Sequence, residues 1–304
     1  MKVIFYLSLI FFGTLSSGVS LFDSDPEELK AICTSDIEGK KRQPPLVTES
    51  ECFDKFNCPV FSEMRKKHML VLVDTTGGLT ENEVGFLKNT VLSRRILTQE
   101  IEPYTKVTIV DLNDKVTTSN AKPIASICRP RSGSQGTPFG ADIPHKSQGV
   151  NYTKSQFVKW GRAISLNTIE KLATQTEARE SQIFEHINAV STFPSFDFRG
   201  EDFEERTLVF FSDLLQNSER FNFPKHCKQA GSGACSDFNK FYKNTSNSRR
   251  NYLDKQKPSF SVNTKIIIYQ IINKNVSSRL EKDLESFYKT YFQWAGIKEE
   301  NIEH

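Results

Sequence analysis

The sequence lacks the short motifs that mark the commonest classes of enzyme. It has no Walker loop, no Gly-x-Ser-x-Gly nucleophile elbow and no His-Glu-x-x-His zinc motif. Only five histidines occur in 304 residues, and none has an evident catalytic companion. These absences argue against nucleotide hydrolases, serine hydrolases and zinc proteases, so we expect a protein that is not an enzyme.

A strong excess of charge of one sign is also missing. The formal net charge is only +3, which is too small to favour a nucleic-acid partner. Long apolar runs are equally scarce, and after the first 20 residues no segment has the length and apolarity of a membrane span. We therefore expect neither a nucleic-acid partner nor a transmembrane segment once the N-terminal run is removed.

Residues 1–20 have the order of a secretory signal peptide. Lys2 provides a positive start, residues 3–12 are almost entirely apolar, and small residues fill most of positions 16–20. The alternative is an uncleaved N-terminal anchor, for which the apolar run is short. We expect an exported protein, either periplasmic or extracellular.

Six cysteines follow this segment, and an even number in an exported chain favours disulfide bonds. A zinc site is the alternative, but spacings such as Cys-x-x-Cys are missing. The simplest of the many possible pairings is Cys52–Cys58, Cys227–Cys235 and Cys33–Cys128.

Short apolar runs alternate with amphipathic stretches beyond residue 66. The expected strands are 68–75, 106–112, 123–128, 206–213 and 264–272. A first helix is expected to begin at Thr80, where a Thr-x-x-Glu capping box stands. Further helical regions are expected at about 154–179, 182–190 and 278–295. This alternation predicts an α/β fold, doubly wound, with a mostly parallel central sheet and helices on both faces.

The domain organisation follows from composition. Residues 21–66 are polar and contain two close cysteines, so we expect an irregular N-terminal segment tethered by disulfides. Residues 67–304 form the α/β domain. Two insertions interrupt it, a Gly-, Ser- and Pro-rich loop at 130–150 and a long polar stretch at 216–258.

Asp74 follows the first apolar run, and Asp213 follows the fourth. If both strands are parallel, both carboxylates emerge at the carboxyl edge of the sheet, where open α/β sheets bind ligands. Thr76 lies two residues after Asp74, and Ser181 begins a helix that can face the same crevice. Carboxylate and hydroxyl oxygens suit Mg²⁺ or Mn²⁺. The predicted metal site is therefore Asp74, Thr76, Ser181 and Asp213.

Each of these four residues, taken alone, also fits a simpler role. Asp, Thr and Ser are favoured N-caps, so capping a helix accounts for any one of the side chains. The Asp74-Thr-Thr-Gly run superficially resembles an aspartic-protease motif, but no second Asp-Thr-Gly occurs. Thr76 stands where an Asp-x-Asp phosphohydrolase needs its second aspartate.

The motifs resemble those of von Willebrand factor A-like domains. Asp74-Thr-Thr-Gly-Gly is similar to their Asp-x-Ser-x-Ser motif. The segment that starts at Glu180 is similar to the family segment that bears a later hydroxyl ligand. Ser212-Asp213 is similar to the end of the family's central strand, which bears an Asp. Ile127-Cys-Arg-Pro, Ser212-Asp-Leu-Leu-Gln and Tyr291-Phe-Gln-Trp-Ala-Gly are similar to a poorly characterised bacterial exported subgroup. The resemblance covers about residues 68–296.

The resemblance implies a metal-ion-dependent adhesion site that engages an acidic residue of a partner protein. Two positions depart from the family pattern, because Gly78 replaces the last Ser of the first motif and Ser181 stands where Thr is usual. The metal site is therefore either weak or lost. We expect an exported protein-binding module. The alternatives are a structural envelope or secretion-associated domain with a degenerate site, and a metal-dependent hydrolase.

Overall fold

The computed structural model describes residues 27, 30–31, 33, 52–54, 56–61, 67–113, 122–132, 150–175, 178, 180–196, 198, 203–261, 263–272 and 277–303. The predicted signal peptide, most of the N-terminal segment and most of the insertion at 130–150 lie outside the described residues.

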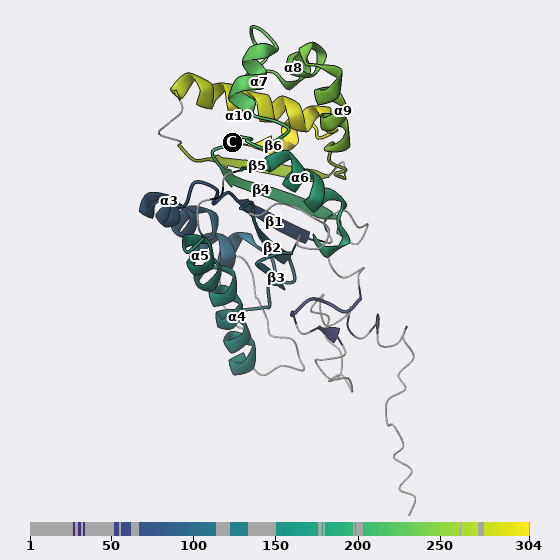
Figure 1. Ribbon diagram of the computed structural model, residues 1–304. Coiled ribbons are helices and arrows are strands. Elements are labelled where there is room, and N and C mark those ends of the chain that lie inside the picture. Colours follow the sequence, from purple (N-terminus) through teal and green to yellow (C-terminus); the bar gives the residue numbers. More distant parts are fainter. Residues whose placement is uncertain are drawn as a thin grey trace, which may run out of the picture.

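One sheet forms the centre of the molecule, in the order β3-β2-β1-β4-β5-β6 (Figure 1). Its strands are β1 (Lys67–Val73), β2 (Lys106–Asp111), β3 (Ala125–Cys128), β4 (Glu205–Ser212), β5 (Thr264–Gln270) and β6 (Ile302–Glu303). Every neighbouring pair is parallel except β2 with β3. The prediction of a mostly parallel sheet is confirmed, and β6 was missed because two residues carry no periodic signal.

The apolar run of β1 is buried on both faces of the sheet. Leu70 and Leu72 belong to the core on one face, whereas Val71 and Val73 belong to the core on the other. All four side chains are 0 % exposed. Because successive side chains of a strand point to opposite faces, a continuous apolar run is what a strand covered on both sides needs.

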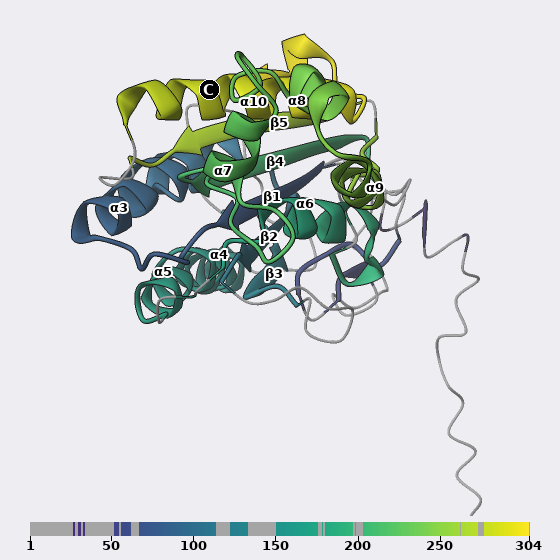
Figure 2. The same ribbon diagram turned by 45° about the horizontal axis from the view of Figure 1, so that its top comes forward.

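Helices cover both faces, as Figure 1 and Figure 2 show. One face carries α3 (Glu81–Phe86), η2 (Leu87–Val91), η3 (Ile96–Glu100), α4 (Val150–Ile164) and α5 (Leu166–Ala173). The other carries α6 (Ile183–Thr192), η4 (Pro194–Phe196), α7 (Phe223–Gln229), α8 (Phe238–Asn244), α9 (Asn247–Lys255) and α10 (Ser278–Trp294), with η5 (Glu299–Asn301) leading into β6.

Local signals set several helix boundaries. The expected capping box opens α3, because the Thr80 hydroxyl and the Glu83 carboxylate each accept from the other's backbone N–H. Gly296 follows α10 with a φ of +100°, a conformation that favours glycine. The helical region expected over about 154–179 begins earlier, at Val150, divides at Ser165 into two helices and ends at Ala173.

The insertion at 216–258, which is polar in composition, is folded and largely helical. It forms α7, α8 and α9, and its aromatic side chains join the main core. Phe223 packs edge-on against Phe287 of α10 at a centroid distance of 4.7 Å, and Phe238 packs against Tyr291 at 5.1 Å. The aromatics are too widely spaced in sequence to reveal a buried face, so only packing against α10 identifies them as core.

The disulfides correct the expected pairing in two of three cases. The bonds are Cys33–Cys52, Cys58–Cys128 and Cys227–Cys235, and only the last was expected. The Asp54 carboxylate accepts from the backbone N–H of Phe56 and of Cys58 and so shapes the turn between Cys52 and Cys58. The Phe56 carbonyl then accepts from the N–H of Cys128, which brings the end of β3 beside Cys58.

We expect the long-range and the short-range disulfide to differ in their contribution to stability. Cys58–Cys128 spans a sequence separation of 70 and Cys227–Cys235 one of 8. In the loop-entropy description, replacing both cysteines by serine lowers the free energy of unfolding by about 4 kcal/mol for the first pair and by about 2.5 kcal/mol for the second. Urea unfolding of the two double variants measures this, and an equal or reversed order would contradict it.

Candidate functional site

The pairing of β1 with β4 sets the location of the site. Val73 lies opposite Phe211, and the backbone N–H of Asp74 donates to the Phe211 carbonyl at 2.8 Å. Asp74 and Asp213 therefore follow neighbouring parallel strands at the same carboxyl edge, as the sequence predicted. In the sheet, β2 pairs with one side of β1 and β4 pairs with the other, so the strand order reverses its direction at β1. The carboxyl end of β1 therefore lies at a topological switch point.

Asp74 is the centre of a compact hydrogen-bond network. Its Oδ1 accepts from the Thr76 hydroxyl at 2.7 Å and from the Thr76 N–H at 3.1 Å. Its Oδ2 accepts from the Ser212 hydroxyl at 2.7 Å and from the Ser181 hydroxyl at 3.3 Å. The residue is only 5 % exposed. Three of the four predicted site residues thus meet at one carboxylate.

Ser181 reaches Asp74 because backbone bonds hold its segment against the loop after β4. Ser181 and Asn217 exchange two backbone hydrogen bonds, both 2.8 Å long. The Gln216 side chain accepts from the N–H of Phe184 and donates to Glu185, so it satisfies the first turn of α6. The N-cap of α6 is Gln182 and that of α3 is Thr80, so neither Ser181 nor Asp74 serves as the cap of these helices.

Asp213 lies at the same edge of the sheet, and its carboxylate accepts a hydrogen bond from the loop after β4. Its Oδ1 accepts from the backbone N–H of Leu215 at 2.8 Å, in a tight turn where Leu214 has a φ of +62°. Ser212, its neighbour in sequence, is the residue at the end of β4 whose side chain donates to Asp74. Sequence reasoning missed Ser212 because alternation along a strand does not show which of two adjacent polar residues faces the neighbouring strand.

Two further polar residues belong to this edge. Thr75 is fully buried, and its hydroxyl donates to Asp111 at the end of β2 at 2.7 Å. Asp111, Asp74 and Asp213 thus stand at the ends of three adjacent strands. Asp111 carried a detectable signal, because it ends an apolar run just as the other two aspartates do.

Gly78 closes the turn after β1 in a conformation that favours glycine. Its φ is +72°, and its N–H donates to the Thr75 carbonyl at 2.9 Å, which closes the turn after β1. A side chain strains this left-handed conformation, whereas glycine adopts it freely. A Ser at this position, which the Asp-x-Ser-x-Ser pattern would require, would therefore strain the turn.

The charge of Asp74 is met by neutral groups. In the described part of the chain, Asp74 forms no ion pair, and its hydrogen-bond partners are hydroxyl and N–H donors. Tyr288 of α10 is fully buried. Burial is the main cause that raises the pKa of Tyr288 well above its usual value, and the negative charges of Asp213 and Asp74 raise it further. Among the described residues, the Tyr288 hydroxyl finds no hydrogen-bond partner.

The residues at the edge suit a hard cation only in part. No group of three or more His, Cys, Asp or Glu side chains able to hold a metal occurs among the described residues. Carboxylate and hydroxyl oxygens do converge, and these are the donors that Mg²⁺ accepts. A cation here would depend on few charged ligands, so the donor set is compatible with weak binding.

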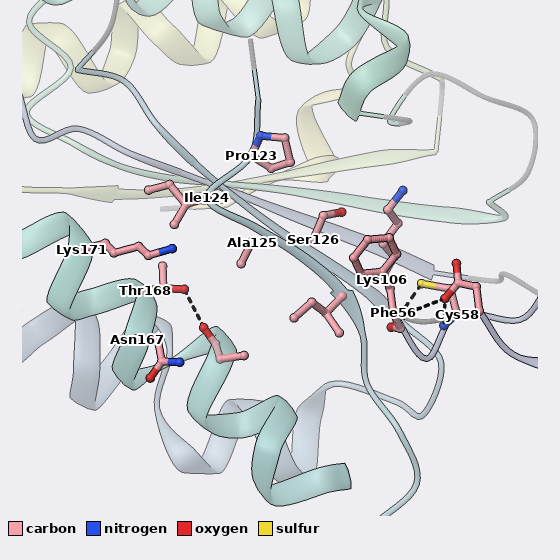
Figure 3. A pocket seen from close by; sticks show the side chains of 13 residues that line it. Phe56, Cys58, Lys106, Pro123, Ile124, Ala125, Ser126, Asn167, Thr168 and Lys171 are labelled. Atoms are coloured by element: carbon pink, nitrogen blue, oxygen red, sulfur yellow. Dashed lines mark hydrogen bonds between the residues drawn. The ribbon is translucent and has the colours of Figure 1, made fainter. Parts of the chain in front are cut away.

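A separate pocket of about 550 Å³ lies beside the edge strand β3 (Figure 3). Side chains of α5 border it on one side, and the turn around Cys58 borders it on the other. Thr168, which lines it, already donates to the Ala163 carbonyl at 2.8 Å. The four residues of the predicted metal site lie outside the lining of this pocket.

Comparison with protein-family models gives no match, and comparison with curated proteins gives none either. The likeness to von Willebrand factor A-like domains therefore rests on the motifs alone. Within the residues that the structure describes, no helix has the length and apolarity to cross a membrane.

We expect Ser212→Ala to lower the free energy of unfolding by roughly 1.5–3 kcal/mol, because it removes a donor to a buried carboxylate and the acceptor for the Leu214 N–H. Chemical denaturation measures the change. Ser232→Ala is the matched control, since Ser232 is exposed and the change there should stay within about 0.5 kcal/mol. Equal stability of the two variants would show that the Asp74–Ser212 bond contributes nothing.

Proposed function

We propose that this chain is an exported protein-binding module that holds Mg²⁺ or Mn²⁺ at the Asp74 edge and uses it to engage an acidic side chain of a partner protein. The observation that carries the proposal is a buried carboxylate at the switch point of a parallel sheet, surrounded by hydroxyls and without an ion pair among the described residues. The carboxyl edge at such a switch point is the usual ligand position in open α/β sheets.

The proposed ligands are Asp74, Thr76, Ser181 and Asp213, with Ser212 as an added candidate. Each offers an oxygen, and the cation would supply positive charge beside the buried carboxylate. The chain's own role is to hold these oxygens in place. The β1–β4 pairing positions Asp74 and Ser212, and the two backbone hydrogen bonds between Ser181 and Asn217 position the segment that contains Ser181.

The proposed fold is the doubly wound, von Willebrand factor A-like arrangement. The mostly parallel sheet, the helices on both faces and the placement of the motifs at strand ends support it. Export, to a periplasm or to the cell exterior, is supported by three disulfides, which persist in oxidising compartments.

A second function is favoured by one observation. The donors around Asp74 already satisfy both of its oxygens without a cation. A structural domain of an envelope or secretion assembly, with a degenerate site, needs no more than this. In that case the network serves to join β1, β4 and the segment before α6.

Calorimetric titration with Mg²⁺ and with Mn²⁺ separates the two functions. We expect saturable binding to the wild-type protein and none to Asp74→Ala, because the central carboxylate is lost. Thr76→Val, which keeps that carboxylate, should weaken binding without abolishing it. Glu170→Gln removes an exposed carboxylate of α5 and should leave the affinity unchanged.

The absence of binding heat in the wild-type protein at millimolar metal would contradict the metal proposal and favour the structural domain. Circular dichroism of each variant shows whether a lost signal comes from lost folding. Metal-dependent turnover of a phosphoester panel that Asp213→Ala abolishes would point instead to a hydrolase. A pull-down from the native host with and without chelator then tests the partner.

A further inference from the structure

A second concave surface lies on the helical insertion, and its lining shares no residue with the Asp74 edge. It is an open pocket of about 590 Å³. The lining residues are Arg220, Ser248, Arg249, Asn251, Tyr252 and Lys255. All of them except Arg220 come from α9, at spacings that place several along one face of the helix. The pocket is therefore formed by a folded helix and the loop before α7.

Three of the lining side chains are cationic, and their charges are not cancelled by carboxylates. Within the part of the chain that the structure describes, Arg220, Arg249 and Lys255 form no ion pair. Arg249 instead donates Nη2 to the uncharged amide oxygen of Gln229 at 2.9 Å. This bond orients the guanidinium and keeps its charge, and the guanidinium has further N–H donors to offer a ligand.

Two carboxylates near α9, those of Glu185 and Asp254, accept hydrogen bonds from uncharged donors. Glu185 accepts on one oxygen from the Tyr252 hydroxyl and on the other from Gln216. Asp254, the neighbour of Lys255 in sequence, accepts from the Tyr242 hydroxyl at 2.7 Å. Burial and the charge of Glu185 both raise the pKa of Tyr252, so its hydroxyl stays protonated and adds no negative charge to the pocket.

The positive field extends to a neighbouring histidine. Burial is the main cause that lowers the pKa of His226 from its usual value, and the charges of Arg249 and Lys225 lower it further. His226 also accepts a hydrogen bond from the Asn222 N–H through Nδ1. The imidazole is therefore neutral at pH 7, and it reports on the charge that surrounds Arg249.

We propose that this pocket binds a small ligand bearing phosphate or sulfate groups. Two guanidinium groups provide the planar donor pairs that match tetrahedral oxyanions, and Lys255 adds a point charge. Ser248 and Asn251 line the same pocket and supply uncharged donors. The volume is that of a small-molecule site.

Calorimetric titration of the full chain tests the proposal, with tripolyphosphate and a sulfated disaccharide as the two probes. A chelator is present throughout, so that a cation at Asp74 plays no part in the result. We expect saturable binding of at least one probe, and the stronger of the two identifies phosphate or sulfate as the source of the oxyanion. The affinity should fall with ionic strength.

Matched variants locate the binding. Arg249→Gln should weaken it about tenfold and Lys255→Gln about threefold, because bidentate guanidinium contacts with oxyanions are stronger than a single ammonium contact. Lys159→Gln removes an equal charge from an exposed position of α4 and should change the affinity less than about twofold. Circular dichroism confirms that each variant is folded.

His226 gives an independent readout by NMR titration. Because neighbouring cations lower its pKa, a bound anion should raise that pKa, so that the imidazole gains its proton at a higher pH than in the free protein. The proposal is overturned if neither probe binds at millimolar concentration, or if Arg249→Gln and Lys159→Gln lose affinity equally. An unchanged His226 pKa at saturation would also count against it.

Discussion

The parallel pairing of β1 with β4 is the constraint on which the rest of the site depends. It places Val73 opposite Phe211 and so brings the first polar residue after β1 beside the last residue of β4. These segments are distant in the chain, since Ser212 and Asp74 are separated by 138 residues. A shift of one residue in this register would turn Ser212 away from Asp74 and move apolar side chains between the two cores.

The buried carboxylate of Asp74 then determines the local structure around it. Burying a charge without a counter-ion is costly unless hydrogen bonds or a cation compensate. Four donors from three chain segments provide that compensation. The same network therefore links the β1 turn, the end of β4 and the segment before α6. A metal site and a purely structural junction are both compatible with this arrangement, and they differ only in whether a cation joins the donors.

The insertion at 216–258 shows a second way in which packing outweighs composition. Its helices are short, and Asp237 and Ser246 are the N-caps of α8 and α9. Phe223 of α7 and Phe238 and Phe241 of α8 pack against α10 and so hold these two helices on the core. In α9, Tyr252 and Leu253 are buried in the same core, and Arg249 and Lys255 lie on the part of the helix that lines the pocket. The polar insertion thus folds into helices that support a pocket.

The amino-acid sequence alone determined the strands that are buried on both faces, the capping box at Thr80, the end of α10 at Gly296 and the shared edge of Asp74 and Asp213. These depend on local chemistry or on the strict rule that parallel strands end at one edge. Tertiary structure decided which distant residues contact one another. It pairs Cys58 with Cys128, selects Ser212 to contact Asp74, and gathers Arg220 with the face of α9. Sequence cannot specify such contacts, because they join distant segments whose approach depends on register and packing across the whole sheet.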